Sequence, residues 1–204
     1  MGNFTRLLIS MLVIGTLLEV TFLATLNYVE GNDGHLFTPT PTPTAIPTPT
    51  ATPTPAFSRP TTIEIPSIGL NTSMIEVGMD ASGAMDSPAD PAQVGWYSLG
   101  TRLGWQGNAV LAAHYDDAHG RPAAFFNLSK IPVGTDIIIT DDIGRKLTYR
   151  VERSESRPIG EWVLSDIFGA SDQRRLNLIT CSGWWQAGVH NYSHRHIVFT
   201  RLVE

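Results

Sequence analysis

The sequence is poor in cysteine and in positive charge. Cys181 is the only cysteine among 204 residues, so no internal disulfide forms and the fold depends on its hydrophobic core. Fourteen basic residues stand against 19 acidic ones, which gives a net charge of −5. Nucleic-acid binding is therefore disfavoured, because no basic excess is available to neutralise phosphates. No internal repeat is found, and 204 residues are enough for one domain with appendages.

Residues 1–30 are predicted to form an N-terminal signal anchor. Arg6 precedes a mostly apolar stretch, Leu7–Leu26, and about twenty helical residues span roughly 30 Å, the thickness of a bilayer core. Glu19 interrupts this stretch, so a cleavable signal peptide with Leu7–Leu18 as its apolar region is the alternative. The positive-inside rule places the C-terminal part outside the cell. We expect a single-pass protein of the cell membrane with an extracellular domain.

Residues 31–56 are predicted to be a disordered linker. Thr38–Pro55 contains seven prolines and eight threonines in eighteen residues. Proline fixes φ and removes a hydrogen-bond donor, so neither helix nor sheet persists there. An extended polyproline-like chain of this length reaches roughly 55 Å at about 3.1 Å per residue. The linker is thus expected to hold a domain away from the membrane.

Residues 57–204 are the remaining foldable domain, and their pattern is all-β. Short runs rich in β-branched residues alternate with turn signals, which is typical of a closed barrel or a sandwich. A hairpin turn is expected at Asp141–Gly144, and Pro122–Leu128 is expected to form one or two helical turns. The predicted strands are Thr61–Ile65, Asn71–Gly78, Asn108–His114, Asp136–Thr140, Lys146–Arg153, Arg175–Cys181 and His194–Val203.

Two predicted strand ends carry residues suited to catalysis. His114 ends the strand that begins at Asn108, and Cys181 ends the strand that begins at Arg175, where Ser182-Gly183 is expected to break it. A thiol attacks as its thiolate, and a nearby histidine can accept or supply the proton. Each residue alone is more often structural: a lone cysteine is usually a small buried hydrophobe, and a lone histidine is usually satisfied within the fold.

Several motifs together resemble the sortase family. Thr180-Cys181 followed by Arg195 is similar to the Thr-Cys and Arg signature of sortases. Three further stretches of the chain resemble segments of the family: Gly107–Asp116, Phe125–Leu128 and Val133–Asp136. A fourth, Val94–Tyr97, is similar to the class E and F branches. The resemblance covers roughly Ile63 to Val203. Ala113 stands where a glycine is usual before the histidine, and the interval with Trp184-Trp185 matches no branch well enough to assign a class.

The resemblance implies a closed sortase-type β-barrel with short helical turns and a transpeptidase function. Cys181 would form a thioacyl intermediate on a Leu-Pro-x-Thr-Gly-like signal cleaved between threonine and glycine. His114 would transfer protons, and Arg195 would hold the substrate carbonyl or an oxyanion. The expected partners are surface proteins with a C-terminal sorting signal and an amine acceptor on cell wall or pilin, with no metal and no cofactor. Two alternatives are a membrane-tethered cysteine hydrolase of the same fold and a non-catalytic surface-binding barrel on a stalk.

Three further residues are candidates for substrate binding. Thr180 precedes the nucleophile, Trp184 follows it, and Asp116 follows the histidine. Trp184 and Trp185 either line a groove or cap the core beneath it. Asp116 and Asp117 either tune the charge of His114 or solvate a loop.

Arg201, His194 and His196 are expected to have structural or surface roles. Arg201 lies six residues after Arg195 on the same predicted strand, nearly 20 Å away, and is expected to be a surface charge. His194 and His196 share the opposite face of that strand. They are expected to be half-exposed histidines on a barrel wall; the alternative is a metal site completed by His190 or His119.

Overall fold

The structure is a computed structural model that describes residues 57–203. The predicted anchor at residues 1–30 and the predicted linker at residues 31–56 lie outside the described residues. Among residues 57–203, no helix has the length and apolar character needed to cross a membrane.

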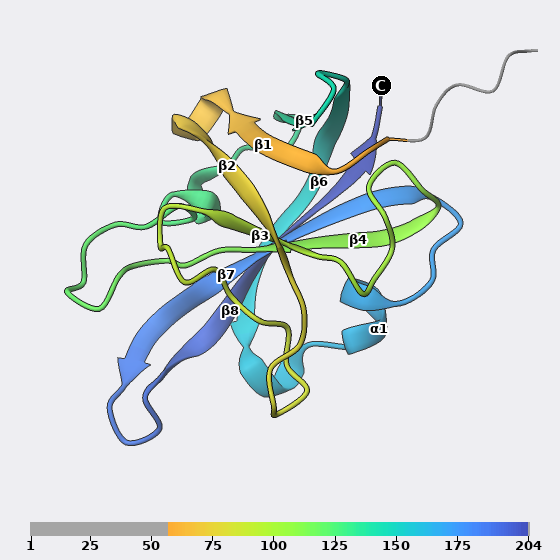
Figure 1. Cartoon of the computed structure of the whole chain (residues 1–204). Helices are drawn as coiled ribbons and strands as arrows, with labels where there is room; N and C mark the ends of the chain where they lie inside the picture. Colours follow the sequence, from red (N-terminus) through yellow and green to blue (C-terminus); the bar gives the residue numbers. More distant parts are fainter. Residues whose placement is uncertain (1–56, 204) are drawn as a thin grey trace, which may run out of the picture. The chain divides into compact units, whose positions relative to one another are not determined.

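Eight strands close into a barrel in the order β1-β2-β3-β4-β7-β8-β6-β5 (Figure 1). The pairs β2/β3 and β4/β7 are parallel, and the remaining pairs are antiparallel. Of the two predicted alternatives, a closed barrel and a sandwich, the structure is the closed barrel. The strands are β1 Pro60–Ile65, β2 Leu70–Val77, β3 Val94–Tyr97, β4 Gly107–Ala112, β5 Asp136–Asp141, β6 Lys146–Pro158, β7 Arg174–Gln186 and β8 Asn191–Leu202.

The barrel interior holds the main hydrophobic core. Leu111 of β4 and Leu176 and Leu178 of β7 are fully buried in it, and the two leucines of β7 share one face because they lie two residues apart. The outer face of β4, β7 and β8 carries a second apolar cluster around Ile197 and Phe199. Because β4 is covered on both faces, five of its six residues are buried, and the strand forms a rigid support for the loop that follows it.

The β7–β8 hairpin extends well beyond the barrel, in blue at the lower left of Figure 1. The prediction that Ser182-Gly183 ends the strand is wrong, because β7 continues to Gln186 and pairs with β8 from Asn191 onward. The pairing register shifts between Ser182 and Trp185, which marks a bulge. Gly183 sits in this bulge with φ +81°, and a Cβ there would overlap Ser193 and His194. Glycine therefore bends the strand without terminating it.

Within residues 57–203, helical structure is confined to short segments. The predicted turns at Pro122–Leu128 are only partly correct, since the 3₁₀ helix η2 spans Leu128–Lys130 and non-helical turns precede it. The amides of Ala124 and Phe125 donate instead to the carbonyls of Pro91 and His114, which holds the segment against other loops. The remaining helices, not predicted from the sequence, are η1 Pro66–Ile68, η3 Ile159–Glu161 and α1 Leu164–Phe168.

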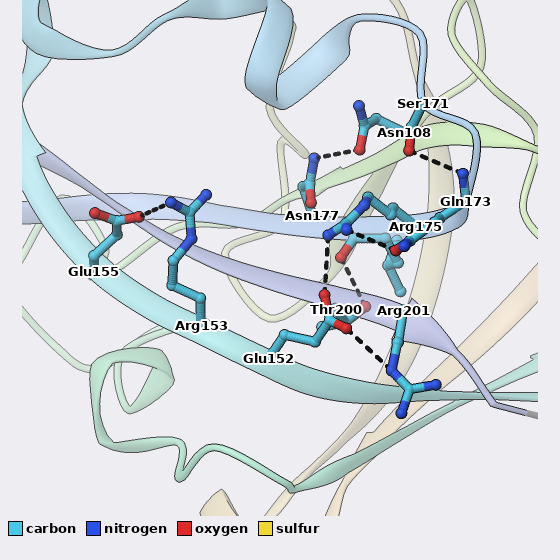
Figure 2. A network of polar contacts seen from close by, with 11 residues as sticks. Asn108, Glu152, Arg153, Glu155, Ser171, Gln173, Arg175, Asn177, Thr200 and Arg201 are labelled. Carbon is cyan, nitrogen blue, oxygen red and sulfur yellow. Dashed lines mark hydrogen bonds and ion pairs between the residues drawn. The ribbon is translucent and has the colours of Figure 1, made fainter.

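Hydrogen bonds from two asparagines, which Figure 2 shows, hold α1 against β4 and β7. Asn177 of β7 donates to the carbonyl of Ile167 in α1 at 2.8 Å, and Asn108 of β4 donates to Gly169 just beyond α1 at 2.9 Å. The two asparagines also bond to each other at 3.3 Å. Since both are buried, this pair fixes where α1 lies over the second apolar cluster.

Candidate active site

His114, Cys181 and Arg195 line the same cleft, which has a volume of about 520 Å³. Cys181 and Arg195 are directly paired residues on the antiparallel strands β7 and β8. His114 lies just after β4, which runs parallel to β7 with Ala112 opposite Ile179. The barrel topology therefore brings three positions together that are far apart in the sequence.

Thr180 joins the strands that carry the histidine and the cysteine. Its side chain is almost fully buried, and its hydroxyl donates to the carbonyl of Ala113 at 2.9 Å. The amide of Ala113 in turn donates to the carbonyl of Ile179 at 3.2 Å. The residue predicted to bind substrate thus has its hydroxyl engaged beside His114, where it fixes the backbone at the end of β4.

The Cys181 thiol is partly buried and experiences opposing electrostatic effects. Burial raises the pKa of the thiol above its usual value, the Arg195 guanidinium lowers it, and the Asp116 carboxylate raises it. The net effect is a raised pKa, so the resting group at neutral pH is the thiol. Attack by this sulfur consequently needs a base to remove its proton.

The guanidinium of Arg195 is held by its own strand. One terminal nitrogen donates to the carbonyl of His194 and the other to Oδ1 of Asn191, both at 3.0 Å. A fixed planar cation beside the sulfur is suited to orienting a carbonyl or an oxyanion. Asn191 was not recognised from the sequence, because only the hairpin register shows that it reaches Arg195.

The imidazole of His114 contacts the β2–β3 connection. Its Nε2 lies 2.9 Å from the carbonyl oxygen of Pro88. A carbonyl accepts only, so this contact requires a proton on Nε2 and leaves Nδ1 as the basic nitrogen of the neutral ring. The Pro88 carbonyl therefore sets the tautomer of His114, a role that nothing in the sequence pattern around Pro88 indicated.

The cleft walls are largely apolar. Two loops contribute to them, the β2–β3 connection and the segment that contains α1. Such a surface suits apolar groups of a ligand, and His114, Cys181 and Arg195 add polar groups to it. The apolar lining residues are Met85, Tyr97, Ile159, Trp162, Leu164, Ile167, Phe168, Ile179 and Ile197.

The two acidic residues after His114 have different partners. Asp116 accepts a hydrogen bond from the hydroxyl of Tyr192 and acts through its charge on Cys181. Asp117 pairs with Arg121 and accepts the amides of His119 and Arg121, and these bonds lower the pKa of its carboxyl to about 2. Asp117 therefore organises its own loop, while Asp116 belongs to the surroundings of the sulfur.

Trp184 and Trp185 lie on the extended hairpin. Their exposed fractions are 63% and 53%, so neither caps the core, and neither lines the 520 Å³ cleft. Trp184 packs edge-on against His194, and Trp185 packs edge-on against Tyr192.

The histidines of β8 are engaged with neighbouring side chains. His196 is buried and contacts Ser154 Oγ at 2.9 Å, and burial lowers its pKa. His194 contacts Ser193 Oγ at 2.7 Å. Within residues 57–203, no three histidine, cysteine or acidic side chains gather as metal ligands.

Arg201 lies at the opposite end of β8. It is about half exposed and forms an ion pair with Glu152 at 3.0 Å, as Figure 2 shows. Glu152 also pairs with Arg175 of β7. This surface network is separate from the cleft, in agreement with the prediction that Arg201 is a surface charge.

The cleft brings together a nucleophile, a proton-transfer group and a fixed cation. These are the components of acyl transfer through a covalent intermediate: a sulfur that attacks a carbonyl, a base and acid for the proton, and a donor for the developing negative charge.

Comparison with known proteins agrees with this chemistry. The sequence model of the family described as "Sortase domain" matches residues 63–203. No curated protein matches the sequence. Among solved structures, sortase A of Listeria monocytogenes is 19% identical with a TM-score of 0.52, covering 71% of this chain and 86% of that chain.

Two further solved structures have comparable similarity. A lid mutant of sortase A from Corynebacterium diphtheriae is 22% identical with a TM-score of 0.54, covering 72% of each chain. Sortase C-1 of Actinomyces oris is 23% identical with a TM-score of 0.54, covering 71% of each chain. At these identities the likeness concerns the fold.

Proposed function

The chain belongs to the sortase family of cysteine transpeptidases, and on that premise we propose that it cleaves a Leu-Pro-x-Thr-Gly-like signal between threonine and glycine and passes the acyl group to an amine. The observation that carries the proposal is that Cys181, His114 and Arg195 line one cleft. A non-catalytic binding barrel has no need to bring these three side chains together.

In the first half-reaction, His114 removes the proton of the Cys181 thiol and the sulfur attacks the threonine carbonyl carbon. The C–N bond to glycine then breaks, and His114 returns the proton to the leaving amine. The product is a thioester between Cys181 and the threonine carbonyl. Nδ1 of His114 is the nitrogen suited to this exchange, because Nε2 contacts the Pro88 carbonyl.

In the second half-reaction, an amine attacks the thioester carbonyl and displaces the sulfur. His114 takes the proton of the attacking amine, and the thiolate regains a proton as it leaves. In both halves negative charge develops on the carbonyl oxygen. Arg195, held by Asn191 and the His194 carbonyl, supplies donors that are already in place when that charge appears.

We further propose an extracellular location at the cell membrane. The apolar N-terminal stretch and the Pro/Thr-rich linker support an anchored domain that acts on surface proteins with a C-terminal sorting signal. The amine acceptor would then lie on the cell wall or on a pilin subunit.

A peptide assay tests the proposed reaction. The protein is mixed with a Leu-Pro-Ala-Thr-Gly peptide, with and without a triglycine acceptor, and analysed by mass spectrometry. We expect a thioester adduct on the wild type, a transfer product when triglycine is present, and neither with Cys181→Ala. An adduct on Cys181→Ala would contradict the assignment of the nucleophile. Equal release of the free acid with and without triglycine would favour the hydrolase alternative.

A further inference from the structure

The segment that carries His114 is tied to the β7–β8 hairpin by a contact outside the cleft. The hydroxyl of Tyr192 on β8 donates to Oδ2 of Asp116, a residue 76 positions earlier in the sequence. Asp116 lies two residues after His114, and Tyr192 lies three residues before Arg195. The bond therefore connects the histidine side of the cleft to the strand that carries the cation.

Aromatic rings reinforce the same connection. The ring of Tyr192 packs edge-on against Tyr115 at a centroid distance of 5.6 Å and against Trp185 at 5.4 Å. Tyr115 packs in turn against Phe126 at 4.8 Å. Tyr115 and Asp116 are the two residues that follow His114, so Tyr192 alone contacts both of them.

His114 is thus held on both sides. Before it, the Thr180 hydroxyl binds the carbonyl of Ala113; after it, Tyr192 binds Asp116. We propose that Tyr192 is a positioning residue whose hydroxyl holds Asp116 against β8 and thereby keeps His114 aligned with Cys181 and Arg195. This proposal rests on the proposed transpeptidase function for its effect on rate.

The charges around Asp116 give the contact a second, measurable consequence. The Asp116 carboxylate raises the pKa of the Cys181 thiol and the Arg195 guanidinium lowers it. Asp117 forms an ion pair with Arg121. The hydrogen bond to Asp116 contributes most to raising the pKa of Tyr192 to about 12, so its hydroxyl stays a donor at physiological pH. His114, Tyr115 and His119 are the other titratable groups between residues 114 and 121. Without the Tyr192 hydroxyl, no hydrogen bond from β8 would offset the negative charge of Asp116, and this charge would raise the pKa of the Cys181 thiol further.

Two substitutions separate alignment from charge. Tyr192→Phe keeps the ring contacts and removes the hydroxyl, whereas Asp116→Asn removes the charge and keeps an acceptor for the hydroxyl. We expect Tyr192→Phe to lower kcat by about 10- to 100-fold with little change in KM. Alkylation of Cys181 by iodoacetamide should move to higher pH in Tyr192→Phe and to lower pH in Asp116→Asn.

Tyr149→Phe is the matched control, because the buried Tyr149 hydroxyl accepts the amide of Gly104 away from the cleft. It should lower the melting temperature without moving the alkylation profile. The proposal is overturned if Tyr192→Phe leaves both kcat and the profile at wild-type values. It is also overturned if Tyr192→Phe only lowers the melting temperature and kcat, with an unchanged profile.

Alkylation needs no peptide, so it tests Tyr192 independently of the proposed reaction. If the wild-type full chain transfers no peptide, the transpeptidase proposal fails. In that case, opposite shifts of the two alkylation profiles would still support the contact with Asp116, and unchanged profiles would overturn it.

Discussion

Arg195 and Arg201 illustrate how two identical side chains on one strand acquire different roles. Arg195 pairs with Cys181 across the sheet, lines the cleft, and is fixed by Asn191 and a carbonyl. Arg201 is half exposed, and its ion pair with Glu152 is the kind of surface contact that contributes little to stability. The geometry of the guanidinium, and not its charge alone, distinguishes Arg195.

Arg195→Lys should therefore lose most transfer activity although it keeps the charge. Lysine replaces a planar fork of five donors with one rotatable point charge, and removing one oxyanion donor costs about 10²–10³ in rate. The alkylation profile of Cys181 should change little in Arg195→Lys, and it should move to higher pH in Arg195→Ala, because the guanidinium lowers the thiol pKa.

Arg201→Lys is the matched control for this experiment and should retain near-normal steady-state rates. If Arg195→Lys retained normal transfer, Arg195 would be only a structural cation. If Arg201→Lys showed the large loss instead, the proposed role in holding the carbonyl or oxyanion would belong to Arg201, six residues further along β8.

The residues missed from the sequence act through contacts that no sequence motif indicates. Tyr192 and Pro88 contact Asp116 and His114, which only the folded barrel brings near them, and Asn191 accepts a hydrogen bond from Arg195, four residues further along β8. His114 and Cys181 could be recognised because each follows an apolar stretch of sequence within a family motif. A hydrogen bond between a hairpin and a loop 76 residues earlier leaves no local pattern.

At the scale of elements, β1, β2, β4 and β5 begin and end within two residues of the predicted strands. β5 alternates between buried and half-buried residues, as expected for a strand with one face on the core, whereas β4 is buried on both faces. The extension of β7 past Cys181 was not predicted, because Ser-Gly usually signals a turn and here forms a bulge inside a two-stranded hairpin. Tertiary pairing with β8 outweighed the local signal.

The β5–β6 hairpin depends on a buried carboxylate. Asp141 ends β5 with 2% exposure, accepts the amides of Ser58, Ile143 and Arg145, and pairs with the Arg145 side chain at 2.8 Å. Burial alone would raise the pKa of Asp141, yet these hydrogen bonds together lower it. The charged form is thus the one that the folded state prefers.

Asp141→Asn should lower the free energy of unfolding by about 1–3 kcal/mol at neutral pH, because an amide cannot accept all of these donors. A lowered pKa contributes stability above the usual value of 3.8 that is lost as pH falls through the folded value. The stabilities of wild type and variant should therefore converge in acid. Urea unfolding at several pH values measures this, with the exposed Asp142→Asn as control. A gap independent of pH would contradict the role of the charge.

At the scale of the whole molecule, two segments precede the barrel in the sequence. Residues 1–30 are expected to anchor the protein in the membrane, and residues 31–56 are expected to form an extended linker. As a helix, the apolar stretch of about twenty residues would reach across roughly one bilayer core, and an extended Pro/Thr-rich linker would add a spacer of roughly 55 Å. A tethered enzyme acts on partners within reach of its linker. This arrangement suits substrates that are themselves displayed at the same surface.

Protease added to intact cells or protoplasts should release the domain at residues 57–204, because the linker is expected to lie outside the membrane without hydrogen-bonded structure. The released fragment, identified by mass spectrometry, should begin within residues 31–56, and a cytoplasmic protein should stay intact as control. A signal anchor predicts that residues 1–30 remain in the membrane fraction, whereas a cleaved signal peptide predicts soluble protein lacking them before any protease is added. Full protection of the domain in intact cells would reverse the proposed orientation, since Arg6 and the positive-inside rule would then have been outweighed by other determinants of insertion.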